Sequence, residues 1–225
     1  MIRFLVLLFL SVQSVAAAAV PQSASSTCAA VGISASKASA VRAAFTSAKV
    51  VPDVVPSINP TVDLSVVYGL KAVNLGNTFS ATETLAEPKI SFTAESNYDP
   101  SSTKYVTIIL DPDAPSPKLP TFRYFLHLIK YDVQPSCITN QSPKTLAPYQ
   151  ALTPLSVAAH RYTILVYRQP PNYVPQLQIS EAPGARNNFN LQSFVAAGNL
   201  QLVGGNFFYE GLGSTVCAVT PGCTL

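Results

Sequence analysis

The chain has 225 residues, of which 48% are hydrophobic and only 11% are charged, whereas an average soluble domain has about 25% charged residues. This composition excludes a disordered, highly charged chain and supplies enough apolar side chains for one packed domain. The 14 basic and 11 acidic residues leave a formal net charge of +3, and the basic residues are scattered singly along the chain. We therefore expect no nucleic acid among its partners.

The chain begins with the three regions of a secretory signal peptide. Met1–Arg3 carries a positive charge, residues 4–12 are apolar, and the small residues from Ser14 to Ala19 offer cleavage points. The apolar run is shorter than the roughly 20 residues that a membrane-spanning helix needs. We therefore predict a signal peptide over residues 1–19, cleaved between about 16 and 19, and a secreted single domain over residues 20–225.

Four cysteines follow the predicted signal peptide: Cys28, Cys137, Cys217 and Cys223. An even number of cysteines in an exported chain predicts two disulfides, for which three pairings exist. The Pro-Gly turn between Cys217 and Cys223 favours pairing those two, which leaves Cys28 with Cys137. The alternatives are free buried thiols or zinc ligands, although no C-x-x-C pair or flanking histidine supports zinc.

One asparagine meets the sequence requirement for N-glycosylation. Asn140 is followed by Gln141 and Ser142, whereas a proline directly after Asn59 blocks the other candidate. In an exported chain, Asn140 is therefore the candidate glycosylation site.

The apolar spacing predicts a mostly β chain with two or three small helices. A helix is expected over Ser34–Lys49, with Ser34 or Ser36 as its N-cap, and prolines at 52 and 56 end it. A second helix is expected over Leu191–Ala197, between Asn190 and Gly198. Short apolar and β-branched runs between turns rich in Pro, Asn, Ser and Gly are typical of strands. The predicted strands are Val62–Tyr68, Lys89–Phe92, Tyr105–Leu110, Phe122–Tyr131, Tyr162–Tyr167 and Gly204–Tyr209.

The two histidines of the chain lie in or beside predicted strands, near other polar residues. Asp111 and Asp113 follow one strand, His127 lies within the next, and His160 shares a face with Tyr162 by the two-residue period. Because sequential strands are often neighbours, Asp111, His127, His160 and Tyr162 can converge on one cavity. A carboxylate against an imidazole fixes its tautomer and leaves the other ring nitrogen to donate to an anion such as phosphate.

Several other interpretations of these residues remain open. The two carboxylates can simply cap the turn, each histidine can be a satisfied core residue, and Arg161 alternates to the other face as a structural ion-pair partner. Zinc would suit the ligand types, but no H-x-H or H-x-x-x-H spacing presets its geometry. A Ser-His-Asp hydrolase is not excluded, although the chain has no G-x-S-x-G motif.

At these residues the sequence resembles the phosphatidylethanolamine-binding protein family. The resemblance rests on Asp111-Pro-Asp-Ala-Pro-Ser116, Arg123-Tyr-Phe-Leu-His127 and His160-Arg-Tyr162, the last followed by a strand that ends at Tyr167-Arg-Gln169. Shorter matches at Val51–Pro56, Phe189–Phe194 and Gly204–Phe208 extend it along the chain. The resemblance implies a mainly β fold, in which a large central antiparallel sheet packs on a smaller sheet with a few peripheral helices.

The resemblance also implies an anion pocket and its function. The implied pocket residues are Asp111, Asp113, His127, Tyr149, His160 and Tyr162, whereas Ala151-Leu-Thr-Pro-Leu155 replaces the family's glycine-rich rim. We expect a secreted, non-catalytic protein without a cofactor that binds phosphate or a phospholipid head group and contacts membranes only peripherally. The alternative is an inhibitor of a secreted or vacuolar serine protease or carboxypeptidase, acting through surface loops or the N-terminal residues Val20–Thr27.

Overall fold

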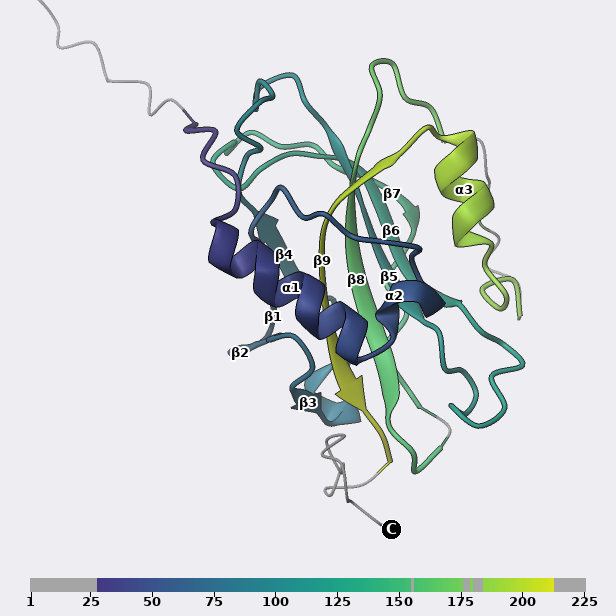
Figure 1. The fold of residues 1–225 in the computed structure, drawn as a ribbon. Coiled ribbons are helices and arrows are strands. Elements are labelled where there is room, and N and C mark those ends of the chain that lie inside the picture. The colour runs from purple at the N-terminus through teal and green to yellow at the C-terminus, as the bar shows by residue number, and fades with distance from the viewer. Residues whose placement is uncertain (1–27, 155, 176–178, 180–183, 213–225) are drawn as a thin grey trace, which may run out of the picture.

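The computed structural model describes residues 28–154, 156–175, 179 and 184–212 (Figure 1). The predicted signal peptide, Val20–Thr27, Cys217 and Cys223 lie outside the described residues. The helices are α1 (Ala35–Ser47), α2 (Val50–Asp53), the 3-10 helix η1 (Ala81–Glu83) and α3 (Leu191–Ala197). The strands are β1 (Leu64–Tyr68), β2 (Lys71–Ala72), β3 (Thr78–Phe79), β4 (Lys89–Phe92), β5 (Tyr105–Asp111), β6 (Phe125–Val133), β7 (Lys144–Ala147), β8 (His160–Arg168) and β9 (Gln201–Glu210).

The strands form two sheets, as the sequence led us to expect. The larger sheet has the order β3-β9-β8-β5-β6-β7 and is antiparallel except for the short parallel pair of β3 and β9. The smaller sheet has the order β2-β1-β4. Because β5 runs antiparallel to both of its neighbours, its carboxyl end lies beside the amino ends of β6 and β8. This topology brings Asp111, His127 and His160 to one end of the sheet.

The larger sheet is covered on both faces (Figure 1). On one face, Phe45 of α1 packs in a core cluster with Ile108 and Phe207. On the other face, Val66 of β1 packs with the next residues along the same strands, Ile109 and Phe208. Successive side chains of a strand point to opposite faces, so strands buried on both sides read as continuous apolar runs. This explains why all seven residues of β5 are buried.

The predicted elements largely agree with the observed ones. Ser34 caps α1 by accepting a hydrogen bond from the backbone of Lys37, and Asn190 caps α3 in the same way. The predicted strand over Phe122–Tyr131 instead begins at Phe125, because Tyr124 has a φ of 23° that a strand residue does not adopt. The short strands β2, β3 and β7 were not predicted, since two to four residues carry too little periodicity.

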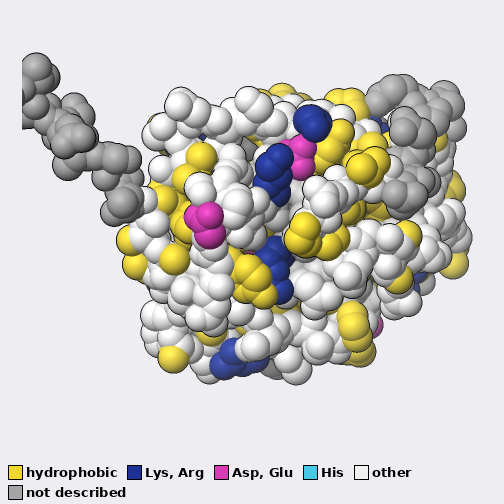
Figure 2. All heavy atoms as spheres, turned by 90° about the horizontal axis from the view of Figure 1, so that it is seen from above, with side chains coloured by type: hydrophobic (Ala, Val, Ile, Leu, Met, Phe, Trp, Pro, Cys, Tyr) yellow, Lys and Arg dark blue, Asp and Glu magenta, His cyan; other side chains and the backbone are white. Residues whose placement is uncertain are grey.

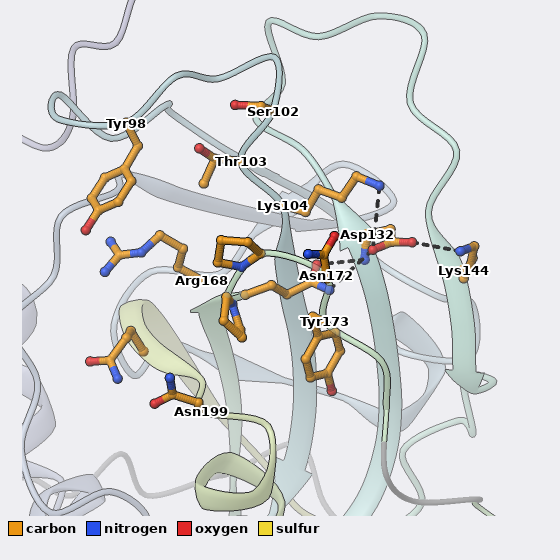
Figure 3. Close-up of a pocket in the computed structure, with 14 residues that line it drawn as sticks. Tyr98, Ser102, Thr103, Lys104, Asp132, Lys144, Arg168, Asn172, Tyr173 and Asn199 are labelled. Carbon is orange, nitrogen blue, oxygen red and sulfur yellow. Dashed lines mark hydrogen bonds and ion pairs between the residues drawn. The ribbon is translucent and has the colours of Figure 1, made fainter.

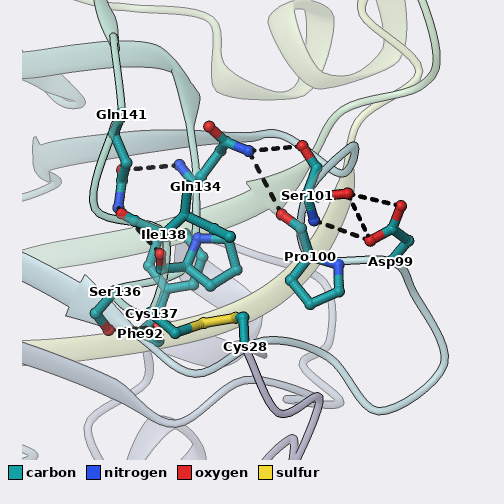
Figure 4. Close-up of a disulfide and its surroundings, with 11 residues drawn as sticks. Cys28, Phe92, Asp99, Pro100, Ser101, Gln134, Ser136, Cys137, Ile138 and Gln141 are labelled. Atoms are coloured by element: carbon teal, nitrogen blue, oxygen red, sulfur yellow. Dashed lines mark hydrogen bonds between the residues drawn. A yellow bond between two sulfur atoms is a disulfide. The ribbon is translucent and has the colours of Figure 1, made fainter. Parts of the chain in front are cut away.

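A disulfide joins Cys28 to Cys137, with the Cα atoms 5.2 Å apart (Figure 4). The sequence favours this pairing, because a Cys217–Cys223 disulfide would leave Cys28 and Cys137 for each other. It ties the residues before α1 to the loop after β6, where Gln134 and Gln141 hydrogen-bond to each other and to nearby carbonyls. The candidate glycosylation residue Asn140 is exposed in the same loop.

Within the described part of the chain, none of the helices is both long and apolar enough to cross a membrane.

Candidate functional site

A cavity of about 250 Å³ lies at the end of the larger sheet where β5 ends and β6 and β8 begin. Four of the residues predicted to form an anion pocket line it: Asp111, His127, His160 and Tyr162. Its other lining residues come mainly from loops, and they are Ala114, Pro115, Phe122, Phe125, Gln150, Thr153 and Asn187. The cavity therefore combines a few buried polar groups with an apolar wall, which is the usual composition of a small-ligand site.

Asp111 and His160 form a buried pair. The Asp111 Oδ2 atom lies 2.7 Å from His160 Nδ1, and Asp111 Oδ1 accepts a hydrogen bond from the backbone of Asp113 at 2.8 Å. The other ring nitrogen of His160, Nε2, lies 2.9 Å from the Ser156 hydroxyl. That hydroxyl is also 2.7 Å from the carbonyl of Ala158, so its hydrogen has two acceptors within reach. Both ring nitrogens of His160 are therefore engaged by the protein.

His127 leaves one ring nitrogen without a partner among the described residues. Its Nδ1 donates to the carbonyl of Gln150 at 2.8 Å, and the Gln150 backbone donates back to the His127 carbonyl at 2.9 Å. The rings of Phe125 and Tyr162 lie beside the imidazole, at 4.9 and 5.5 Å between centroids. Burial lowers the pKa of His127 to about 4, so the ring is neutral at pH 7 and its Nε2 is an acceptor there.

Tyr162 supplies a hydroxyl that stays protonated. Its ring stacks on His160 and on Phe208, and its side chain is 1% exposed. Burial, together with the nearby Asp111 carboxylate, raises the pKa of Tyr162 well above its usual range. The hydroxyl is therefore a neutral hydrogen-bond donor across the physiological pH range.

Asp113 faces away from the cavity. Its carboxylate accepts hydrogen bonds from Arg161 Nε and Nη2 at 2.9 and 2.7 Å, and from the Arg161 backbone at 2.8 Å. Arg161 also contacts Asp53 and the carbonyl of Ala48, which connects the start of β8 to the helices. The interpretation of Arg161 as a structural ion-pair partner is confirmed, and Asp113 serves that pair and does not line the cavity.

Comparisons with known proteins identify the family. The family model described as Phosphatidylethanolamine-binding protein matches residues 70–208. The chain belongs to the phosphatidylethanolamine-binding protein family. CEN-like protein 1 from Nicotiana tabacum is 30% identical over 173 residues, which cover 76% of this chain and 86% of that protein. The 26 kDa secreted antigen from Toxocara canis is 32% identical, and the match covers 73% of this chain and 62% of the antigen.

Solved structures of the family share the fold. A carboxypeptidase Y inhibitor, whose structure was determined in complex with its cognate proteinase, superposes with a TM-score of 0.66 at 25% identity. That superposition covers 77% of this chain and 96% of the inhibitor. The phosphatidylethanolamine-binding protein from Plasmodium vivax superposes with a TM-score of 0.61 at 22% identity, covering 75% of this chain and 96% of that protein. The mainly β fold with two sheets and few helices is confirmed.

In the present chain, Tyr149 does not line the cavity, although the family resemblance implied that it would. Its hydroxyl donates to the carbonyl of Thr84 at 2.6 Å, and its ring lies 6.5 Å from the ring of Tyr68. It thereby packs in the core between the two sheets. The fully buried Glu210 lies in the same region and is the register partner of His160 on β9, where its Oε2 accepts a hydrogen bond from the Thr84 hydroxyl at 2.8 Å.

Several residues that shape the cavity were missed by the sequence analysis. Gln150 engages Nδ1 of His127 and leaves Nε2 of that ring without a partner among the described residues, whereas Ser156 engages Nε2 of His160. Arg186 is buried and donates to the carbonyls of Leu126, His127 and Pro148, so it holds the start of β6 against the loop that carries Gln150. In the sequence these three are simply polar residues in loops that contain prolines. Such residues are too common for a binding site to be predicted from them.

The described residues contain no group of three or more His, Cys, Asp or Glu side chains arranged to hold a metal ion.

Proposed function

We propose that this chain is a secreted, non-catalytic binding protein whose cavity between β5, β6 and β8 takes the phosphoryl head group of a phospholipid such as phosphatidylethanolamine. The observation that carries the proposal is the arrangement of His127. Its ring is buried in the cavity wall and held by Gln150, and its Nε2 has no partner among the described residues. The Tyr162 hydroxyl on the neighbouring wall adds a neutral donor.

The negative charge of Asp111 limits how the cavity can bind an anion. Asp111 is already engaged by His160, and a second negative charge beside it would be repelled unless a proton or a cation accompanied it. His127 provides the place for that proton, because its Nε2 accepts one and then donates to the anion. Binding of the head group is therefore coupled to uptake of a proton by His127.

The dimensions of the cavity limit what it takes. A volume of about 250 Å³ lies below the roughly 300–1,000 Å³ of sites that hold drug-sized ligands. It accommodates a head group and excludes the acyl chains, which would stay in the membrane. Membrane contact would consequently be peripheral and weak.

Three observations support secretion. The first 19 residues have the pattern of a signal peptide. The Cys28–Cys137 disulfide belongs to an oxidising compartment. The relative from Toxocara canis is named a secreted antigen. The experiment that checks secretion is N-terminal sequencing of the protein recovered from the medium of an expressing cell.

The test of the pocket is calorimetric titration of the mature protein with glycerophosphoethanolamine. Replacing His127 by leucine keeps an apolar side chain in the wall and removes the free nitrogen. Because a hydrogen bond to a charged group contributes about 1.5–3 kcal/mol, we expect His127→Leu to weaken binding about tenfold to hundredfold. The double variant His127→Ala, His160→Ala should lose binding altogether.

The matched control is Lys118→Gln, an exposed substitution outside the cavity, which should bind the ligand as the native protein does. Circular dichroism checks that each variant is folded. Undiminished binding by a folded His127→Leu variant would show that the head group does not use this cavity.

A second candidate function is inhibition of a peptidase, and one observation favours it. The carboxypeptidase Y inhibitor shares the fold at 25% identity over most of both chains. Inhibition would act through surface loops or the N-terminal residues Val20–Thr27. Removing Val20–Thr27 should abolish inhibition of carboxypeptidase Y and leave binding of glycerophosphoethanolamine unchanged, and inhibition that survives the truncation would assign it to another surface.

A further inference from the structure

A second and larger cavity, of about 730 Å³, lies at the opposite end of the larger sheet (Figure 3). It is built where β5 and β9 begin and where β6 and β8 end, so the length of the strands separates it from the candidate anion pocket. Its lining comes from the loop before β5, the end of β6, the start of β7, the end of β8 with the loop that follows it, and the start of β9.

One wall of the cavity presents two ammonium groups that share a single carboxylate. Asp132 Oδ2 lies 2.9 Å from Lys144 Nζ, and Asp132 Oδ1 lies 3.9 Å from Lys104 Nζ. Figure 3 shows the two lysines on either side of Asp132. Gln169 holds that aspartate in place by accepting from its backbone N–H at 3.0 Å. The wall therefore has one surplus positive charge, and each ammonium group keeps donors for a ligand.

The opposite wall presents a guanidinium group with spare donors. Arg168 Nη1 contacts both carboxylate oxygens of the buried Glu95, at 2.8 and 2.9 Å, and the guanidinium lies 3.8 Å from the centre of the Tyr98 ring. Its Nε and Nη2 atoms donate to no other described residue. Because Glu95 balances the charge of Arg168, this wall adds directional donors and no net charge.

The remainder of the lining is neutral and rich in amides. The side-chain amides of Asn172, Asn199 and Gln201 make no hydrogen bond to another described residue, and each carries both a donor and an acceptor. Leu, Ile, Val, Met and Phe are all absent from the lining of this cavity, in which tyrosines and prolines are the apolar groups. This composition disfavours an acyl chain or an aliphatic peptide side chain.

We propose that this second cavity binds an acidic saccharide, a sugar oligomer that carries carboxylate groups. Sugar hydroxyls both donate and accept hydrogen bonds, as the unpaired amides do, and the carboxylate of the sugar meets the surplus charge of Lys104 and Lys144. The tyrosine and proline rings suit the flat faces of sugar rings. Figure 2 looks onto this end of the molecule, and near the upper edge of the face it shows an acidic side chain between two basic ones.

The test is titration of the mature protein, followed by calorimetry and NMR, with a galacturonic acid trisaccharide. The neutral galactose trisaccharide of the same linkage is the comparison ligand. We expect the acidic sugar to bind at least tenfold more tightly than the neutral one, and its affinity to fall with added salt because the lysines are solvent-exposed.

The double variant Lys104→Gln, Lys144→Gln should weaken binding of the acidic trisaccharide at least tenfold. Its matched control is Lys37→Gln, Lys89→Gln, which removes two exposed charges at positions outside the cavity and should bind as the native protein does. Asn172→Ala with Gln201→Ala should weaken binding of both sugars, since these exposed amides serve no other described residue.

Three results would overturn the proposal. They are the absence of binding of the acidic trisaccharide, equal binding by the Lys104→Gln, Lys144→Gln variant, and tighter lysine-dependent binding of an Asp- and Glu-rich peptide than of the sugar. The last result would assign the cavity to an acidic protein segment.

Discussion

At the level of single residues, burial moves the pKa of two side chains near the candidate anion pocket in opposite directions. It lowers the pKa of His127 to about 4 and raises the pKa of Glu210 to about 7. In both cases burial disfavours the charged form, which is the protonated form for histidine and the ionised form for glutamate. As the pH rises, His127 therefore increases the free energy of unfolding between about 4 and 6.5, whereas Glu210 decreases it between about 4.5 and 7.

The proposed role of His127 predicts that the affinity for the ligand depends on pH. In the proposed mechanism, binding of the phosphoryl group takes up a proton, so the affinity for glycerophosphoethanolamine should rise as the pH falls from 7.5 to 5.5, by at most about tenfold for each pH unit. The phosphodiester of this ligand does not titrate in that range, so the change belongs to the protein. Calorimetry in two buffers of different ionisation enthalpy measures the proton uptake, which the His127→Leu variant should lack. A pH-independent affinity of the native protein would contradict the proton-coupled mechanism.

Glu210 predicts a pH dependence of stability. The folded protein binds a proton at Glu210 more tightly than the unfolded chain does, so the free energy of unfolding should fall as the pH rises from about 4.5 through about 7. Glu210→Gln removes the buried charge and should raise the free energy of unfolding at pH 8 by about 1–2 kcal/mol. Urea unfolding of both proteins at pH 5 and pH 8 checks this. His127 contributes with the opposite sign between pH 4 and 6.5 in both proteins, and it therefore cancels in the comparison. Equal stabilities at pH 8 would show that Glu210 is not desolvated in solution.

At the level of elements, α1 lies against the larger sheet through a close contact with β9. A Cβ atom added at Gly205 would stand 2.5 Å from Phe45 Cζ and 3.2 Å from Ile58 Cδ1. At these distances the buried ring would have to move, and the neighbouring core leaves it little room. Gly205 therefore allows α1 to lie close to β9.

Gly205→Ala should destabilise the protein by about 1–3 kcal/mol through overpacking. Thermal unfolding measures this loss. Combining Gly205→Ala with Phe45→Leu should cost less than the sum of the two single substitutions, because the shorter side chain makes room for the new methyl group. Additive losses would indicate that the ring already relaxes away from the strand.

The bounds of some helices and strands could be predicted from local sequence patterns, and those of others could not. The bounds of β4 and α3 agree with the prediction residue for residue: Pro88 directly precedes β4, and α3 lies between Asn190 and Gly198. β8 and β9 extend beyond their predicted ends because pairing with neighbouring strands recruits His160, Arg168 and Gln201, which no apolar pattern marks. Tertiary pairing thus lengthens the strands of the larger sheet.

At the level of the whole molecule, one disulfide constrains the chain. Cys28 and Cys137 are 109 residues apart, and the loop that they close contains α1, the smaller sheet, β5 and β6. Closing a loop of about 100 residues stabilises a protein by up to about 5 kcal/mol in the chain-entropy model. The disulfide therefore contributes to the stability of the entire domain and does not belong to either pocket.

Replacing both cysteines, Cys28→Ser with Cys137→Ser, should lower the free energy of unfolding by about 2–5 kcal/mol. Urea unfolding under non-reducing conditions measures the loss. Binding of glycerophosphoethanolamine to the folded variant should be unchanged, because neither cysteine lines that cavity. A loss below about 0.5 kcal/mol would show that the unfolded chain is already compact around this link.

The sequence by itself determined the fold class, the capped helices α1 and α3, the apolar runs of β5, β6 and β8, and the convergence of Asp111, His127 and His160. The mostly β character and the helices follow from periodicity, the convergence follows from the tendency of sequential strands to pair, and the packing of a large sheet on a smaller one follows from the family resemblance. Only the tertiary structure decided that Asp113 and Tyr149 lie outside the cavity, that Gln150 and Ser156 engage the histidines, and that a second cavity exists at the other end of the sheet. Its walls come from several loops whose polar residues look like ordinary surface residues until packing brings them together.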